Sequence, residues 1–182
     1  MAKILEILAS GFEEIEAVAP ADIWRRLGFE VTLAGLEDMQ VTGAHGIVLE
    51  CDALLEEVSG LDFDAVFLPG GMPGSTNLRD SAAVREIVKQ MASSGRVVSA
   101  ICAAPMVLSQ CGVLGGKAFT MYPGMSEFLV SGDVPQSVSA VRDGNIVTGK
   151  GPGAVFAFAS EVASALGVDA SGCYDAMMME KK

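Results

Sequence analysis

The chain has 182 residues and a formal net charge of −11. This acidic balance repels a phosphate backbone, and no apolar run approaches the roughly 20 residues that a membrane span needs. We therefore expect no nucleic acid and no membrane as a partner. The N-terminus lacks the pattern of a cleavable signal peptide, so we expect a cytoplasmic protein with one domain, residues 1–182.

Strand and helix patterns alternate along the chain, which predicts an α/β fold with a mainly parallel sheet and helices on both faces. Strand patterns cover 2–9, 29–35, 46–52, 63–71, 96–101 and 117–122, with 46–52 read as part of a hairpin. Helical patterns cover 12–28, 81–95, 103–112 and 152–167, and a hairpin with an Asp-Gly turn covers 139–149. In such a sheet, ligands bind where the strands end.

The four cysteines and the single histidine limit cross-links and metal sites. The cysteines form no C-x-x-C pair, so free thiols are expected. His45 leaves too few ligands for a structural zinc site, and we expect no metal and no cofactor.

Cys102 stands where the apolar run 96–101 stops and a helical run begins. Its small neighbours Ala100, Ala103 and Ala104 suit a tight strand-to-helix turn, where a helix N-terminus would lower the pKa of the thiol. Two interpretations stay open: a nucleophile on this turn, and a buried core thiol.

The segment LPGGMPG (68–74) ends another strand with the pair Gly70 and Gly71. Adjacent glycines allow a turn whose backbone N–H groups face a neighbouring site, as in an oxyanion hole. The alternative is a plain strand-to-helix turn. GNIVTGKG (144–151) resembles a phosphate-binding loop but has Gly151 where Ser or Thr is required, and its pattern is that of a strand.

Three carboxylates begin the first helix in GFEEIEAV (11–18). The helix dipole and solvation explain Glu13 and Glu14. Glu16 follows Ile15 on the apolar side of the helix, where burial would raise its pKa and let it hold or move a proton near a thiol.

The four segments GFEEIEAV, LPGGMPG, AICAAP and GKGPGAVFAFA, in this order and spacing, resemble the ThiJ/PfpI family, on the branch of the parkinsonism-associated protein deglycase. The resemblance covers essentially the whole chain. It implies a flavodoxin-like three-layer sandwich of the class I glutamine amidotransferase type, and a homodimer.

The resemblance also implies roles for individual residues. Cys102 would occupy a nucleophile elbow, and Glu16 would hydrogen-bond its thiol. Gly71 and Ala103, next to Gly70, would supply backbone N–H groups to the substrate. Arg26 would contribute near the pocket.

The chain departs from the family pattern at three positions. Ala103 stands where protease-like relatives have a histidine, which argues against peptide hydrolysis. Tyr122 stands where the deglycase branch often has a histidine, so it is the candidate for the third catalytic position. His45 falls where relatives often carry an arginine, and we expect it on the surface or at the pocket rim, where it could touch substrate.

Together these features predict a cofactor-independent glyoxalase or protein deglycase that acts on α-oxoaldehydes of the methylglyoxal type and on their side-chain adducts. The alternative is an oxidative-stress sensor or redox-activated chaperone in which Cys102 is oxidised.

Overall fold

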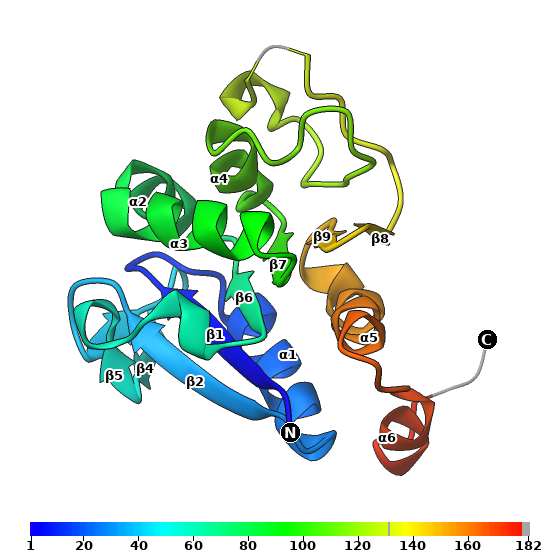
Figure 1. Ribbon diagram of the computed structural model, residues 1–182. Helices are drawn as coiled ribbons and strands as arrows, with labels where there is room; N and C mark the ends of the chain where they lie inside the picture. Colours follow the sequence, from blue (N-terminus) through cyan, green and yellow to red (C-terminus); the bar gives the residue numbers. More distant parts are fainter. Residues whose placement is uncertain (131, 180–182) are drawn as a thin grey trace.

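A computed structural model describes residues 1–130 and 132–179, and a twisted sheet forms its centre (Figure 1). Within these residues the sheet has seven strands in the order β5-β2-β1-β6-β7-β9-β8. Only β8 is antiparallel to its neighbour. The strands are β1 (Lys3–Leu8), β2 (Glu30–Gly35), β5 (Ala53–Leu54), β6 (Ala65–Leu68), β7 (Val97–Ile101), β8 (Ala140–Asp143) and β9 (Ile146–Gly149).

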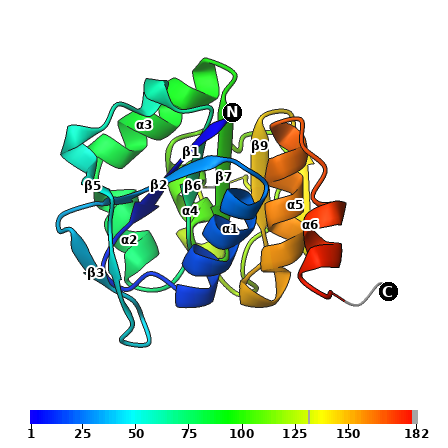
Figure 2. The ribbon, with the colours of Figure 1, turned by 90° about the horizontal axis from the view of Figure 1, so that it is seen from below.

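Helices cover both faces of the sheet. They are α1 (Glu14–Arg26), α2 (Gly74–Asp80), α3 (Ala82–Ser93), α4 (Pro105–Gln110), α5 (Val155–Ala165) and α6 (Ser171–Ala176). Helices α1 and α5 lie side by side on one face, while α2, α3 and α4 cover the other (Figures 1 and 2). The flavodoxin-like three-layer α/β prediction is confirmed.

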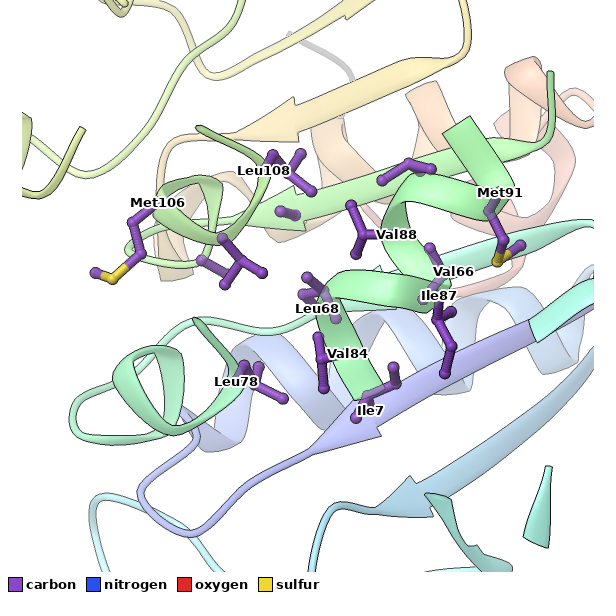
Figure 3. Packing of buried hydrophobic residues seen from close by; sticks show 14 of the residues in the cluster. Ile7, Val66, Leu68, Leu78, Val84, Ile87, Val88, Met91, Met106 and Leu108 are labelled. Atoms are coloured by element: carbon purple, nitrogen blue, oxygen red, sulfur yellow. The ribbon is translucent and has the colours of Figure 1, made fainter. Parts of the chain in front are cut away.

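The core follows from the alternation of side chains along buried strands. Ile7 of β1 and Leu68 of β6 point to the α3 side, where Val84 and Val88 meet them (Figure 3). Ile4 of β1 packs in the opposite layer, under α1 and α5. Among the described helices, none is long and apolar enough to cross a membrane.

Glu6 breaks the apolar pattern of β1. Its side chain is fully buried, and neither carboxylate oxygen has a hydrogen-bond partner within the described residues. Burial raises the pKa of Glu6 well above its ordinary value of 4.5. The protonated form is therefore strongly favoured inside the fold.

A small hairpin leaves the sheet between β2 and β5. It consists of β3 (Gln40–Thr42) and β4 (Val48–Glu50), in agreement with the predicted excursion. Backbone hydrogen bonds from Gly11 N to Thr42 O (2.8 Å) and from Ala44 N to Phe12 O (2.7 Å) fix it against the loop before α1.

The predicted strand 117–122 is wrong. The segment makes one isolated bridge, between Thr120 and Gln136. Thr120 N donates to the Thr148 side chain at 2.9 Å, and the Thr120 hydroxyl donates to backbone carbonyls of Gln136 and Val138. Side-chain hydrogen bonds take the place of a backbone ladder here.

Candidate active site

The carboxyl ends of β1, β6 and β7, adjacent parallel strands, meet at one edge of the sheet. The loop after β1 leads into α1, the loop after β6 contains the glycine pair, and the turn after β7 contains Cys102. The topology therefore brings together three segments that the sequence singled out.

Cys102 lies on a tight turn between β7 and α4. Its φ angle is +63°, in the left-handed region that non-glycine residues seldom occupy. Two backbone bonds hold this conformation: Cys102 N donates to Gly149 O at 2.9 Å, and Tyr122 N donates to Cys102 O at 2.8 Å. The residue is only 8% exposed, so it is both buried and on the strained turn. Backbone strain of this kind is concentrated at functional sites.

The glycine pair after β6 lies against both Cys102 and α1. A Cβ on Gly70 would be 2.4 Å from Glu16 Oε2 and 2.6 Å from Cys102 Cβ. A Cβ on Gly71, whose φ is +91°, would be 2.4 Å from Glu13 N. Only glycine permits this close approach.

Glu16 lies in the first turn of α1 and is fully buried. Its Oε2 accepts a hydrogen bond from Gly70 N at 2.9 Å, and Glu13 caps the helix by accepting from Glu16 N at 2.8 Å. Burial raises the pKa of Glu16 to about 7, although the hydrogen bond with Cys102 opposes the shift. A group with this pKa can both accept and release a proton near neutrality.

The pKa of the Cys102 thiol is raised, contrary to the lowering expected from a helix N-terminus. Burial is the largest cause, and the charge and hydrogen bond of Glu16 add to it. Backbone N–H groups of Ala103 and Gly71 reach the sulfur and lower the pKa in part. The expectation of Glu16 beside the thiol did not include the effect of its charge on the thiol pKa, and the predicted helix 103–112 begins only at Pro105. Proton removal by Glu16, instead of a preformed thiolate, therefore suits this geometry.

Tyr122 is near the site, as the resemblance implies. Its backbone N–H donates to the Cys102 carbonyl oxygen. Its ring atom Cδ2 is 3.3 Å from the position that a Cβ on Gly151 would take. That same Cβ position is 3.9 Å from Glu16 Oε1. The tyrosine is 49% exposed, so its ring covers one side of Gly151 while remaining open to solvent.

Gly149 and Gly151 are site residues that the sequence analysis did not assign. The Gly149 carbonyl orients Cys102, and Gly151 separates Glu16 from Tyr122. The signal that could have found them is their place in the segment GKGPG, immediately after a strand.

His45 pairs with Glu14, and no hydrogen bond or ion pair among the described residues links it to the thiol. His45 Nδ1 lies 2.7 Å from Glu14 Oε2, and His45 N donates to Glu14 Oε1 at 2.6 Å. The hydrogen bond and charge of Glu14 raise the pKa of His45. Burial opposes ionisation of Glu14, but the bonds from His45 lower its pKa overall. Glu14 is thus a buried anchor for the hairpin loop, not the solvated dipole partner that we expected.

Arg26 is not near the site within this chain, which corrects the expectation from the resemblance. It is the last residue of α1, ten residues after Glu16, or about 15 Å along a helix. Its guanidinium pairs with Asp22 at 2.8 Å, and the hydrogen bond with this carboxylate raises the pKa of Arg26.

One group of side chains has the composition of a metal site. Ligand atoms of Glu13, Glu14 and His45 lie within 4.8 Å of one another. The two Glu14 oxygens are already engaged by His45 and Ile47, so these contacts explain the group as the attachment of the hairpin.

Comparison with known proteins agrees with this geometry. The sequence profile of the DJ-1/PfpI family matches residues 2–165. Protein dj-1beta of Drosophila melanogaster is 40% identical over 164 residues, which are 89% of this chain and 88% of the relative. A deglycase of Pyrococcus abyssi is 35% identical over 161 residues, or 87% of this chain and 96% of the relative.

Solved structures show the same arrangement of elements. The structure of oxidized DJ-1 from Toxoplasma gondii matches with a TM-score of 0.93 and 32% identity, and it covers 100% of both chains. Family profile, relatives and structure agree, and the chain belongs to the DJ-1/PfpI family.

Proposed function

We propose that the protein is a cysteine-dependent glyoxalase and deglycase that converts α-oxoaldehydes of the methylglyoxal type into 2-hydroxy acids without a cofactor. The observation that carries the proposal is the close approach of Glu16 to Cys102 across Gly70, where a single Cβ would lie 2.4 Å from Glu16 Oε2 and 2.6 Å from Cys102 Cβ. Backbone N–H groups of Gly71 and Ala103 lie beside the sulfur. The deglycase from Pyrococcus abyssi supports the reaction class.

The reaction begins when the Cys102 sulfur attacks the aldehyde carbon while Glu16 accepts the thiol proton. Glu16 passes this proton on to the aldehyde oxygen, which becomes the hydroxyl of a hemithioacetal, so Glu16 is again a carboxylate. The N–H groups of Gly71 and Ala103 stabilise the negative charge that develops on the oxygen before it is protonated. This step joins the substrate to the chain without any oxidant.

Glu16 then removes hydrogen from the former aldehyde carbon as a proton, which gives an enediolate, and returns a proton to the adjacent carbonyl carbon. The hydroxyl proton on the former aldehyde carbon passes to the oxygen of the adjacent carbon, which becomes the new hydroxyl. The product is a thioester of a 2-hydroxy acid. Water cleaves this thioester, releases the acid and restores the thiol. Over the whole reaction the aldehyde carbon is oxidised to the level of an acid and the adjacent carbonyl carbon is reduced to an alcohol, so the two changes balance. In deglycation, the aldehyde comes from an adduct on a cysteine, lysine or arginine side chain.

Turnover of methylglyoxal to lactate in the absence of glutathione tests the proposal. We expect the purified protein to form lactate, the Cys102→Ala variant to form none, and Cys51→Ala to match the wild type. Cys51 is a matched control because it is a second buried cysteine, 4% exposed, on another part of the sheet edge. Equal turnover by Cys102→Ala would overturn the proposal.

A redox role for Cys102 is the second candidate, because the related Toxoplasma protein is described in an oxidized state. In this role peroxide would oxidise the thiol to a sulfinic acid, and Glu16 would hydrogen-bond the product. Loss of the thiol signal at low peroxide, with no turnover of any oxoaldehyde, would favour this role over the enzyme.

We also propose that the protein is a homodimer in the cytoplasm. Exposed apolar residues occur on α1, at Ile15 and Val18, and on the hairpin, at Ile47 and Val48. The hairpin is bound to the start of that helix, since Ile47 N donates to Glu14 Oε1 at 3.4 Å. Light scattering should give the mass of two chains, and Val18→Glu should shift it toward one. A monomeric wild type would overturn this proposal.

A further inference from the structure

A groove of about 480 Å³ is lined by Tyr122 and Gly151, and a Cβ on Gly151 would lie 3.9 Å from Glu16 Oε1. Tyr122, Pro123 and Pro152 supply apolar walls, while Ser139 and Lys150 supply polar groups. A smaller hollow of about 110 Å³ shares Tyr122, Pro123 and Lys150 with it. Tyr122 and Lys150 thus stand between two adjoining depressions.

The groove is tied to the candidate nucleophile through the backbone. Lys150 follows Gly149, whose carbonyl accepts the Cys102 N–H, and it precedes Gly151, which borders both Tyr122 and Glu16. A further hydrogen bond, from Lys150 N to Ser139 O at 2.9 Å, fixes the backbone of the lysine. The groove therefore begins one residue away from groups that hold the reacting centre.

Lys150 is a cation without a counterion in the described part of the chain. Its ammonium group contacts the Ser137 hydroxyl at 3.4 Å, and no ion pair of residues 1–130 or 132–179 includes it. Neither depression is lined by an aspartate or a glutamate among these residues. In a chain with net charge −11, this combination produces a local site that attracts anions.

We propose that Lys150 binds an anionic group of the substrate, a carboxylate or a phosphate, while the aldehyde end reaches Cys102. This inference rests on the proposed function, because it names the substrate class of the same site. The ammonium group supplies a charge-assisted hydrogen bond, and the Ser137 hydroxyl, 3.4 Å from it, can add another. The apolar walls hold the part of the substrate between its two ends. Substrates with an anion at one end and an α-oxoaldehyde at the other are selected over neutral ones.

The test compares matched pairs of α-oxoaldehydes that differ in one anionic group. The phosphate pair is hydroxypyruvaldehyde and its phosphate ester, and the carboxylate pair is phenylglyoxal and 4-carboxyphenylglyoxal. We expect wild type to have the higher kcat/KM for the anionic member of at least one pair. Lys150→Met should reduce that preference about 10-fold, mainly through KM, and Lys150→Arg should preserve it.

Lys89→Met on α3 is the matched control, because it removes the same charge from an exposed position away from the groove. If Lys150→Met loses the preference in only one pair, that pair identifies the anion as phosphate or carboxylate. If Lys150→Met loses the preference in both pairs, either anion binds. Equal preferences in wild type, Lys150→Met and Lys89→Met overturn the inference.

Binding to the Cys102→Ala variant separates this inference from the proposed function. NMR titration with hydroxypyruvaldehyde phosphate should show binding that Lys150→Met weakens about 10-fold. Binding that depends on Lys150, together with a wild type that turns over no oxoaldehyde, would overturn the proposed function alone. Turnover by wild type with binding that does not depend on Lys150 would overturn the anion site alone.

Discussion

Glu16 of α1 and Cys102 after β7 lie against each other across Gly70, and each group changes the pKa of the other. Burial raises the pKa of Glu16 to about 7, and burial together with the Glu16 charge raises that of the thiol. Above about pH 7 the pair therefore holds one proton, on the thiol, and this proton can move to the Glu16 carboxylate as the sulfur reacts.

Replacing Glu16 with glutamine should remove this proton transfer. The amide is close in shape to the carboxyl group, so we expect the fold to persist while kcat falls by roughly two to four orders of magnitude. Lactate formation from methylglyoxal measures the rate, and circular dichroism checks the fold. Unchanged kcat in a folded Glu16→Gln protein would show that this residue only packs.

Replacing Tyr122 with histidine should increase turnover. An imidazole exchanges protons near neutral pH and a phenol scarcely accepts one, so we expect Tyr122→His to raise kcat/KM and to introduce a new pH dependence between pH 6 and 7. Tyr122→Phe separates the hydroxyl from the ring. If the histidine variant loses activity while the phenylalanine variant keeps it, Tyr122 only shapes the pocket.

A methyl group at Gly70 should disrupt the centre. The added Cβ would lie 2.4 Å from Glu16 Oε2 and 2.6 Å from Cys102 Cβ, so both groups must move. We expect Gly70→Ala to lose turnover and about 1–3 kcal/mol of the free energy of unfolding. Gly115→Ala is the control, since the nearest atom to its Cβ is 4.0 Å away. Similar activity in the two variants would contradict the described packing.

Replacing Glu6 with leucine should stabilise the protein at neutral pH. The pKa of buried Glu6 is raised, so folding retains a proton that the unfolded chain releases above its ordinary pKa of 4.5. Stability is full below this value and declines as pH rises toward the raised pKa. Removing a buried carboxyl group that has no hydrogen-bond partner should raise the free energy of unfolding by about 1–3 kcal/mol at pH 7, and by less at pH 4.5.

Urea unfolding at several pH values measures this gain, and the exposed Glu56→Leu variant is the control. Both variants lose one carboxylate, but only Glu6→Leu removes a buried one. A Glu6→Leu protein that is less stable than wild type at pH 7 would contradict the expected cost of this burial.

Much of the fold could be predicted from the pattern of apolar residues, because a strand such as β6 is buried on both faces and is therefore continuously apolar, and the buried residues of β1 and β7 depart from this only at Glu6 and Ser99. The segment 117–122 has a similar apolar pattern, yet side-chain bonds of Thr120 replace a ladder. The apolar pattern indicates which residues are buried, but it does not show whether their backbone N–H and C=O groups bond to a neighbouring strand or to side chains.

The site was predictable to the extent that strand ends and glycines mark it. Cys102, Gly70 and Gly71 meet because parallel strands end at one edge. The direction of the thiol pKa was not predictable, because it depends on how closely Glu16 approaches the sulfur. The expectation that Arg26 lies near the pocket was wrong, because Arg26 is at the opposite end of α1 from Glu16.

The pH dependence of kcat/KM for methylglyoxal tests most directly whether Glu16 acts on Cys102. Activity should rise with pH through about 7 as Glu16 loses its proton and becomes a base, and this rise should be absent in Glu16→Gln. His45→Asn controls for the histidine, whose pKa the hydrogen bond and charge of Glu14 raise, and this variant should keep the rise. A rise near pH 7 that persists in Glu16→Gln would contradict the account.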